Sequence, residues 1–320
     1  MPIARDAANE EIVMAIEHAR QRAVTKPWGS TDLRPWSANP DDGIAIGEVW
    51  FERSGASAPD PELLLKLLFT REPLSIQVHP DDAVARSMGL VHGKTEAWYI
   101  LSATDGAEVA VGLERRVATA QLRAAIEDGS IAGLVKWRRV AADDVVFVPA
   151  GTIHCIGAGL VVAEIQQRSD VTFRLFDHGR RRELHVDAAL AAADPRPAEP
   201  QMAERRLTDT RTLLVACPSF VLERIHLRPE SVRELRTQRE TWILVLAGDA
   251  RFGPVRAFVG QAVYLADDRA SVSAGPDGLT ALLAYPGPRP IAGMLHEAGR
   301  RSSFDPRSDG PEVRAMERQP

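Results

Sequence analysis

The chain has 320 residues, of which 45% are hydrophobic and 26% charged, as is ordinary for a globular protein. This length suits two domains, or one core with appendages. The formal net charge of -5 makes the chain a poor general binder of nucleic acid or of an anionic membrane.

Cysteine usage and the opening segment predict the compartment. Cys155 and Cys217 lie far apart and in no CxxC pair, which argues against a zinc ribbon and favours a reducing compartment. The opening sequence MPIARDAANEEIV has no apolar core of signal-peptide length, and no run approaches the roughly 18 apolar residues of a membrane span. We therefore expect a cytoplasmic protein.

The predicted elements begin with helices and change to strands. Apolar residues recur at helical spacing over residues 8–23, and residues 61–69 form an apolar run that begins with proline. Residues 74–113 contain LSIQVHP, AWYILSA and AEVAVGL, which are typical of short strands. Residues 119–128 predict a helix, with the first residue as its N-cap and Gly129 at its end.

Short strands separated by turns fill most of the remaining chain. Residues 143–178 are interpreted as a run of strands, and ELHVDAALAAAD as a helix after them. Residues 194–204 hold three prolines and are interpreted as a linker. Short strands return over residues 213–286. The pattern predicts a mainly β protein with two sandwiches or jelly-roll barrels and peripheral helices.

Four side chains in the first β-rich stretch are candidate ligands of a metal ion. Gln77 and His79 are two residues apart on one strand, so their side chains point to the same face. Glu96 lies at a strand start in GKTEAWY, and His154 follows the turn in PAGTIHCI. Two imidazoles, a carboxylate and an amide oxygen suit zinc or a similar divalent ion. A histidine satisfied in the core or at the surface is the alternative for each imidazole.

Rival ligands lie nearby. Asp81, Asp82 and His92 are close in sequence to the first two candidates. The two aspartates are explained more simply as the N-cap and first turn of a short helix, DDAVARSM. Cys155 follows His154 on a strand, so we expect its side chain to point away from the metal and into the core.

Several segments together resemble the signature segments of class I mannose-6-phosphate isomerases. They are SIQVHPDD, GKTEAWYIL, FVPAGTIHCIG, LVVAEIQQRSDVTFRLFD and RELHVDAAL, in the family's order, with KPWGS and GEVWFE upstream. The resemblance implies a cupin fold and the interconversion of D-mannose 6-phosphate and D-fructose 6-phosphate. It also implies one zinc ion per chain, with these ligands: Gln77, His79, Glu96 and His154.

Some features depart from the family pattern. Gly47-Glu48-Val49 stands where the family commonly has Gly-Glu-Ser or Gly-Glu-Cys, and the second β-rich stretch has only His226 rather than a His-x-His pair. The chain lacks a long inserted helical domain, so it resembles the compact bacterial type. We expect a catalytic cupin domain with an N-terminal helical segment over residues 1–193, a linker over 194–210, a degenerate cupin-like barrel over 211–290 and a polar tail over 291–320.

The chemistry of an aldose-ketose isomerase requires a base near C1 and C2 and a group that stabilises an enediol-type intermediate. Glu164 is the candidate base, because a carboxylate on the apolar strand LVVAEIQQ is costly to bury unless it is paired or used. An outward-facing edge glutamate is the alternative. Lys94 shares a face with Glu96 if the segment is extended, which puts its ammonium near the metal; an ordinary solvated lysine is the alternative.

Basic residues further along are candidates for binding the substrate. Arg174 in TFRLFD suits a bidentate grip on phosphate or sugar oxygens, and the family resemblance makes it an active-site residue. Asp170 either orients Arg174 or contacts the sugar, with a turn-forming aspartate as the alternative. The run at residues 180–182 attracts phosphate or is a solvated surface run.

We therefore expect a metal-dependent isomerase of a small phosphosugar, monomeric or homodimeric, without a nucleic-acid or membrane partner. One alternative is another cupin metalloenzyme, such as an iron-dependent oxygenase, which the amide ligand Gln77 and the nearby Lys94 argue against. The other is a non-catalytic cupin that binds a sugar phosphate. Retention of Lys94, Glu164 and Arg174 beside all four ligands argues against it.

Overall fold

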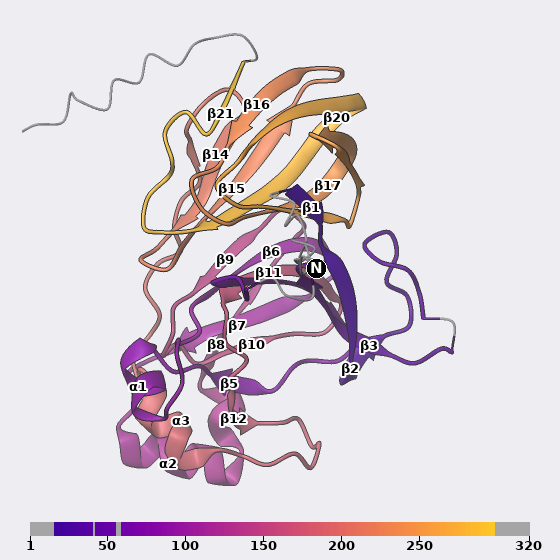
Figure 1. Ribbon diagram of the computed structural model, residues 1–320. Coiled ribbons are helices and arrows are strands. Elements are labelled where there is room, and N and C mark those ends of the chain that lie inside the picture. The colour runs from indigo at the N-terminus through magenta and orange to yellow at the C-terminus, as the bar shows by residue number, and fades with distance from the viewer. Residues whose placement is uncertain (1–15, 41, 56–58, 298–320) are drawn as a thin grey trace, which may run out of the picture.

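The structure, a computed structural model, describes residues 16–40, 42–55 and 59–297. Over these residues the strands form three sheets, of ten, six and five strands. The sheets follow one another from the C-terminal part of the chain, at the top of Figure 1, down to the helices at the bottom. The prediction of a mainly β protein is confirmed.

The ten-stranded sheet comes almost wholly from the C-terminal part of the chain. Its apolar side chains form a core of their own, which includes Ile243, Phe252 and Leu283. The N-terminal strand β1 joins its edge by pairing with β19. The strands are β1 (Ile16–His18), β13 (Arg205–Arg206), β14 (Arg211–Ala216), β15 (Phe220–Leu227), β16 (Val232–Arg236), β17 (Thr241–Phe252), β18 (Val255–Phe258), β19 (Ala262–Leu265), β20 (Arg269–Pro286) and β21 (Leu295–Glu297).

The six-stranded sheet lies between the other two and packs against each through apolar side chains. On one face Leu67 and Tyr99 pack against the ten-stranded sheet at Trp242. On the other face Trp98 packs against the five-stranded sheet at Val111. The strands, in sheet order, are β2 (Arg20–Ser30), β3 (Ile46–Glu52), β4 (Leu63–Thr70), β11 (Leu160–Gln167), β6 (Glu96–Ala103) and β9 (Val145–Val148).

The five-stranded sheet carries helices on its outer side. Its strands, in sheet order, are β12 (Phe173–Phe176), β5 (Ile76–Val78), β10 (His154–Ile156), β7 (Glu108–Leu113) and β8 (Val135–Arg139). Its outer apolar residues pack against the helices α2 (Thr119–Asp128) and α3 (Val186–Ala192) and the 3-10 turn η1 (Ser130–Gly133), while α1 (Asp82–Ser87) follows β5. Among the helices that the structure describes, none is long and apolar enough to span a bilayer.

Two expected helices in the first part of the chain are wrong. The described part of the expected N-terminal helical segment, residues 16–23, forms β1 and the start of β2; residues 8–15 lie outside the described residues. Pairing with β19 and β3 decides this structure, and a few apolar residues at helical spacing cannot reveal such distant partners. The run at residues 61–69 belongs to β4, whose eight residues are all buried, so no polar alternation marks it as a strand.

The other helix predictions agree with the structure. Residues 119–128 form α2, and Gly129 ends it in the left-handed conformation, with a φ of 80°. Its N-cap is Ala118 rather than Thr119. Asp81 caps α1 through a hydrogen bond from the Val84 amide, with Asp82 in the first turn, as expected.

Candidate active site

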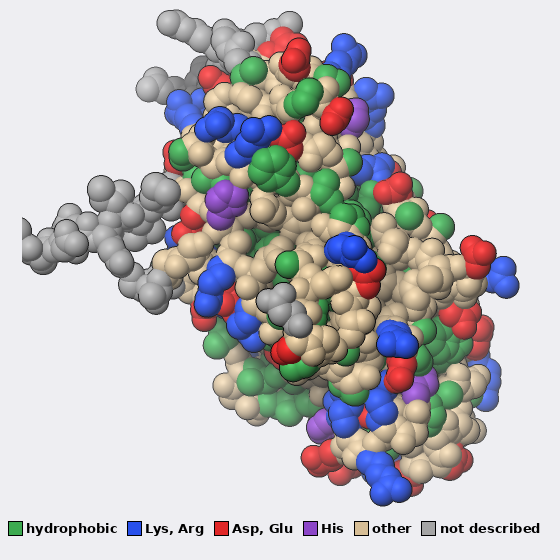
Figure 2. All heavy atoms as spheres, turned by 90° about the vertical axis from the view of Figure 1, so that its right-hand side faces the viewer, with side chains coloured by type: hydrophobic (Ala, Val, Ile, Leu, Met, Phe, Trp, Pro, Cys, Tyr) green, Lys and Arg blue, Asp and Glu red, His purple; other side chains and the backbone are tan. Residues whose placement is uncertain are grey.

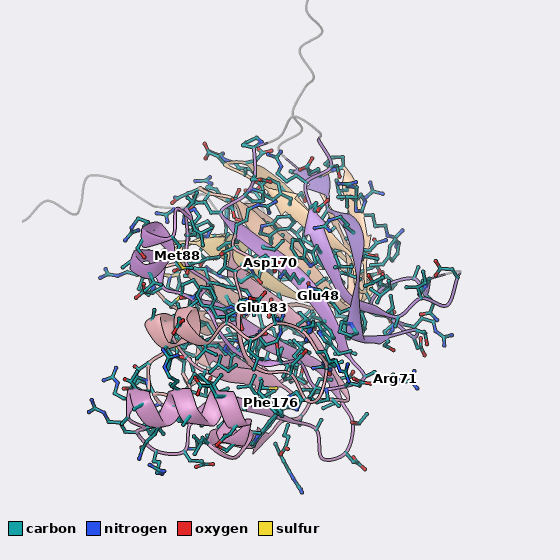
Figure 3. The ribbon with its side chains drawn as sticks, turned by 90° about the horizontal axis from the view of Figure 1, so that it is seen from below. Glu48, Arg71, Met88, Asp170, Phe176 and Glu183 are labelled. Carbon is teal, nitrogen blue, oxygen red and sulfur yellow. The ribbon has the colours of Figure 1, made fainter. Side chains whose placement is uncertain are left out.

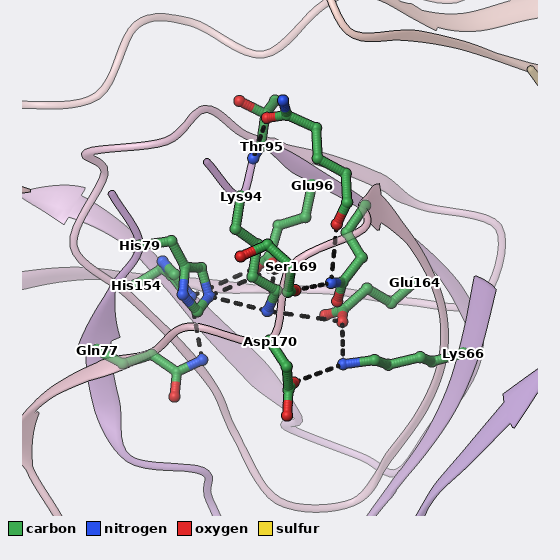
Figure 4. Close-up of polar contacts among 12 residues, drawn as sticks. Lys66, Gln77, His79, Lys94, Thr95, Glu96, His154, Glu164, Ser169 and Asp170 are labelled. Atoms are coloured by element: carbon green, nitrogen blue, oxygen red, sulfur yellow. Dashed lines mark hydrogen bonds and ion pairs between the residues drawn. The ribbon is translucent and has the colours of Figure 1, made fainter. Parts of the chain in front are cut away.

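The facing sides of the five- and six-stranded sheets bring the predicted site residues together. In the five-stranded sheet His154 pairs with Gln77, and Gln77 pairs with Arg174 on its other side. Residues opposite one another in an antiparallel pair point to the same side, so these three side chains form a row. In the six-stranded sheet Glu96 pairs with Gln166, two residues beyond Glu164. Figure 4 shows the resulting cluster.

Three buried side chains form a group that could hold a metal ion. The ligand atoms of His79, Glu96 and His154 lie within 4.8 Å of one another, and each residue is 1% exposed. Glu96 Oε1 lies 3.3 Å from His154 Nε2, and Glu96 Oε2 lies 3.5 Å from His79 Nε2. The rival ligands are elsewhere: Asp81 caps α1, and Asp82 accepts from the Gly93 amide.

Backbone carbonyls fix the orientation of both imidazoles. His79 Nδ1 donates to Val171 O and His154 Nδ1 donates to Thr152 O, each at 2.8 Å. A carbonyl oxygen can only accept, so in each ring Nδ1 carries the proton and Nε2 presents a lone pair to the centre. Burial is the largest cause that lowers the pKa of His154 to about 4 and holds the pKa of His79 well below its usual value. Both rings are therefore neutral, as metal ligands must be.

The donor set fits a divalent cation. Neither carboxylate oxygen of Glu96 has a hydrogen-bond partner of good geometry among the described residues, although Lys94 Nζ lies 2.8 Å from Oε2. Buried polar atoms without such partners are rare and call for an explanation. Two imidazole lone pairs and a buried carboxylate that face one point are the ligands a zinc-like ion requires.

Gln77 lies beside this group, but its amide presents the nitrogen. Its Nε2 is 3.3 Å from His154 Nε2, and its Oε1 accepts from Ser75 Oγ at 3.0 Å. The amide can donate to the lone pair of His154. A half-turn of the amide would exchange the two atoms and offer the oxygen to a cation.

Lys94 is held against the same group. Its Nζ lies 3.0 Å from His79 Nε2 and 3.9 Å from Glu164 Oε1, besides its ion pair with Glu96. Burial alone would lower the pKa of Lys94, but the carboxylates of Glu96 and Glu164 outweigh it and hold the pKa above its usual value. The Lys94 ammonium thus lies near the candidate metal ligands, as expected, and is not the solvated lysine of the alternative.

Glu164 is a buried carboxylate with the electrostatics of a base. It is 4% exposed, and its Oε2 accepts from Trp98 Nε1 at 3.1 Å. Burial, followed by repulsion from Glu96, raises the pKa of Glu164 to about 6, against the opposing effect of Lys94 and Lys66. A carboxylate of this pKa is ionised at neutral pH and is a stronger base than an exposed one. The outward-facing alternative is thereby excluded.

Two further charged residues, absent from the sequence prediction, complete the cluster. Lys66 of β4 is 2% exposed, and its Nζ lies 3.1 Å from Asp170 Oδ1, 3.8 Å from Glu164 Oε1 and 3.9 Å from Glu48 Oε2. Glu48 also pairs with Lys26 at 3.1 Å. A lysine in the otherwise apolar run LLLKLLF was the available signal, because a buried lysine requires a partner.

The lysines of this cluster, Gln77, Glu48, Glu164 and Asp170 line one pocket of about 250 Å³, a little below the range of roughly 300–1,000 Å³ typical of ligand sites. His79, Glu96 and His154 are not among its lining residues. In the view from below, Glu48 and Asp170 lie near the middle of the molecule, with Met88 of the α1 segment to one side (Figure 3). The lining residues are Lys26, Trp28, Glu48, Lys66, Leu68, Leu74, Ser75, Gln77, Lys94, Glu164, Asp170, Thr172, Arg174 and Arg182. The pocket suits a small polar molecule, and its many cations favour an anion.

Arg174 and Arg182 both line the pocket, and both lie against the Asp177 carboxylate. Asp177 accepts from Arg182 Nε at 2.9 Å, and Arg174 Nη1 donates to Glu183 O at 2.8 Å. Arg180 donates to Asp177 as well, at 3.2 Å, and Arg174 Nε lies 3.9 Å from Asp177 Oδ1, so three guanidinium groups surround one carboxylate. Burial and then the charge of Arg182 lower the pKa of Arg174. Asp170 pairs with Lys66, so the expectation that it orients Arg174 finds no support in its contacts.

Two further residues, Cys155 and Trp28, pack in the core. Cys155 lies on the other face of β10 from His154, in the core against the helices, as expected. Trp28 is 3% exposed and both packs in the core between the sheets and lines the pocket. On the face seen in Figure 2 basic and acidic side chains are interspersed.

Relatives and a solved structure that this chain matches are mannose-6-phosphate isomerases. The chain is 37% identical over 223 residues to the mannose-6-phosphate isomerase of Streptococcus mutans, which covers 65% of this chain and 69% of the relative. It is 32% identical over 232 residues to the mannose-6-phosphate isomerase ManA of Bacillus subtilis, with coverages of 65% and 70%. The fold is similar to the crystal structure of the mannose 6-phosphate isomerase from Bacillus subtilis, with a TM-score of 0.71, 25% identity and coverages of 83% and 98%. A search of family profiles found no match.

Proposed function

The chain belongs to the family of mannose-6-phosphate isomerases, and on that premise we propose that it interconverts D-mannose 6-phosphate and D-fructose 6-phosphate in this pocket. The observation that carries the proposal is a buried carboxylate, Glu164, within reach of Lys94 beside the group His79, Glu96 and His154. A base, a proton-carrying cation and a metal site are the parts that this reaction requires.

Glu164 and Lys94 divide the proton transfers between them. The Glu164 carboxylate takes the proton from C2 of the aldose, and the C2–H electron pair forms the C1–C2 double bond while O1 takes a proton from the Lys94 ammonium. The resulting enediol then gives its O2 proton back to the Lys94 amine, and C1 takes the proton from Glu164. The C2 carbonyl of the ketose is formed, and both side chains return to their starting states.

The metal-binding group would hold one divalent ion, and we propose zinc. His79, Glu96 and His154 would provide three ligands. After a half-turn of its side-chain amide, which now presents Nε2 to His154, Gln77 would offer its oxygen as a fourth. When bound, the ion supplies positive charge that stabilises negative charge developing on the sugar oxygens. The carbonyls of Val171 and Thr152 keep both Nε2 atoms turned toward it.

The phosphate is held at the end of the pocket lined by Arg174 and Arg182. Guanidinium groups bind phosphate oxygens through paired hydrogen bonds. Arg174 and Arg182 both lie against the Asp177 carboxylate and keep further N–H groups for an anion. Arg174 lies one strand from Gln77, so a phosphate at this end leaves the other end of the sugar toward the metal group. Asp170 lines the pocket and is a candidate partner for a sugar hydroxyl.

Several finer points stay predictions. We infer that the five- and six-stranded sheets together form a catalytic cupin barrel and that the ten-stranded sheet forms a second, non-catalytic one. The domain limits at residues 193, 210 and 290, the cytoplasmic location and the monomeric or homodimeric state rest on the sequence.

The test is turnover of a panel of sugar phosphates by the purified protein loaded with zinc. We expect D-mannose 6-phosphate and D-fructose 6-phosphate to be interconverted and their unphosphorylated sugars to react far more slowly. Binding of these sugar phosphates without turnover would support the non-catalytic alternative instead. Oxygen consumption with any member of the panel would support the oxygenase alternative.

A further inference from the structure

We propose that Asp82 and Gln167 are positioning residues, which fix the backbone of residues 93–95 and thereby place the Lys94 side chain for the isomerisation. The proposal rests on the proposed function, since it assigns these two residues a role in that reaction. Neither lines the catalytic pocket; both line a separate surface pocket that also contains His92 and Arg239.

A closed set of hydrogen bonds joins the two side chains to the segment. Asp82 Oδ1 accepts from the Gly93 amide at 2.7 Å and from Gln167 Nε2 at 3.0 Å. Gln167 Oε1 accepts from the Thr95 backbone amide at 2.9 Å, and the backbone amide of Gln167 donates to Thr95 O at 3.1 Å. The Gly93 amide is the largest cause that holds the pKa of Asp82 below its usual value. Lys94 therefore lies between two residues that are both bound by this pair.

The segment is also held closely against the chain that follows β5. The Lys94 amide donates to Pro80 O at 3.0 Å. A Cβ at Gly93 would lie 2.5 Å from the carbonyl carbon of Asp81 and 2.6 Å from Pro80 O, so no larger residue fits without backbone movement. We call Asp82 and Gln167, with their hydrogen bonds to Gly93 and Thr95, the clamp. Asp82 follows β5, which carries Gln77, and Gln167 ends β11, which carries Glu164. The clamp therefore connects both strands to the segment of Lys94.

Lys94 depends on such support because it precedes the strand that carries Glu96. Strand β6 begins at Glu96, so the sheet ladder reaches this segment only through the backbone bond from Gln167 to Thr95 O and does not hold residues 93 and 94. Figure 4 shows Lys94 and Thr95 beside Glu96. The Lys94 ammonium lies 3.0 Å from His79 Nε2, 2.8 Å from Glu96 Oε2 and 3.9 Å from Glu164 Oε1, so a small shift of its backbone changes its distance to the proposed base. A misplacement of about 1 Å can cost on the order of a hundredfold in rate.

The experiment measures steady-state kinetics and bound metal for four variants of the full chain. Asp82→Ala and Gln167→Met remove the clamp, and we expect kcat to fall by about tenfold to a hundredfold, with KM within about twofold and one metal per chain retained. Asp82→Asn keeps an oxygen that accepts both hydrogen bonds, so it should keep most of kcat. The control Asp81→Ala removes only the N-cap of α1, and kcat should stay within about twofold of the wild type.

Amide hydrogen exchange of Gly93 and Thr95 provides a second measurement, with faster exchange expected in Asp82→Ala than in Asp82→Asn. Wild-type kcat in Asp82→Ala and Gln167→Met would overturn the positioning role while leaving the isomerase function standing. An equal loss of kcat in Asp82→Asn and Asp82→Ala would also overturn the positioning role. The same holds for a loss of kcat that parallels a loss of bound metal. An inactive wild type would overturn the proposed function and this role with it.

Discussion

Replacing Lys66 by methionine is expected to move the pH dependence of isomerisation to higher pH. Lys66 is a buried cation, and its Nζ lies 3.8 Å from Oε1 of the proposed base Glu164. The base must be ionised to remove a proton, so the rate rises with pH through its pKa of about 6. Without the ammonium, the ionised carboxylate loses a stabilising charge and its pKa rises.

The magnitude follows from the distance. Two unit charges 3.8 Å apart interact by about 4 kcal/mol at an effective dielectric constant of about 20, and about 1.4 kcal/mol corresponds to one pH unit. Because Lys94 remains 3.9 Å from the same oxygen and water enters the pocket, we expect a smaller rise, to between about 7 and 8. At pH 7 the rate should then fall roughly twofold to tenfold, and at pH 9 it should recover.

The assay measures kcat/KM for D-mannose 6-phosphate, because kcat/KM reports the ionisations of the free enzyme. We choose a range of about pH 5 to 9.5 to span the expected pKa values. Lys26→Met is the matched control, because it also removes one ammonium group, which lies 3.1 Å from Glu48 Oε1. The acid limb of the pH profile should stay in place in this variant. Lys66→Gln gives a second test if the methionine variant folds poorly. An unshifted acid limb in a folded Lys66 variant would refute this electrostatic reasoning.

The remaining predictions concern the base, the phosphate and the second β-rich region. Glu164→Gln should lower kcat by about 10²-fold or more with unchanged metal content; full activity would remove this residue as the base. Arg174→Met should raise KM about tenfold to a hundredfold in steady-state kinetics, because a charged hydrogen bond contributes about 1.5–3 kcal/mol; an unchanged KM would contradict the phosphate assignment. Arg211→Met leaves the buried Glu223 without its bidentate partner and should lower the free energy of unfolding, measured in urea, by about 3–5 kcal/mol. The double variant with Glu223→Leu should recover much of this stability. Wild-type stability of the single variant would refute the reasoning.

Sequence patterns predicted the type of a helix or strand correctly where one of its faces is exposed to solvent. Residues 119–128 carry a clear helical pattern and a glycine in the left-handed conformation, so α2 has the predicted bounds. Strand β4 is buried on both faces, so its pattern cannot be distinguished from that of a buried helix. Strand β1 pairs with β19, almost 250 residues away, and no local signal carries that information.

For the site, strand geometry and family resemblance contributed different parts. The shared face of Lys94 and Glu96 followed from an extended segment, and the 2.8 Å pair agrees with it. The meeting of His154 with Glu96 depends on two different sheets, which residue spacing alone does not predict. Lys66 was missed because its three carboxylate neighbours come from three separate segments.

The central claim is a metal-dependent isomerase whose metal group is His79, Glu96 and His154. The most direct test titrates zinc into chelator-treated protein and measures bound metal and turnover of D-mannose 6-phosphate on the same samples. We expect turnover to rise in proportion to bound zinc up to one ion per chain, and both to be lost when His79 and His154 are replaced by alanine. Isomerisation that survives complete removal of metal, or normal metal content in the double variant, would contradict the claim.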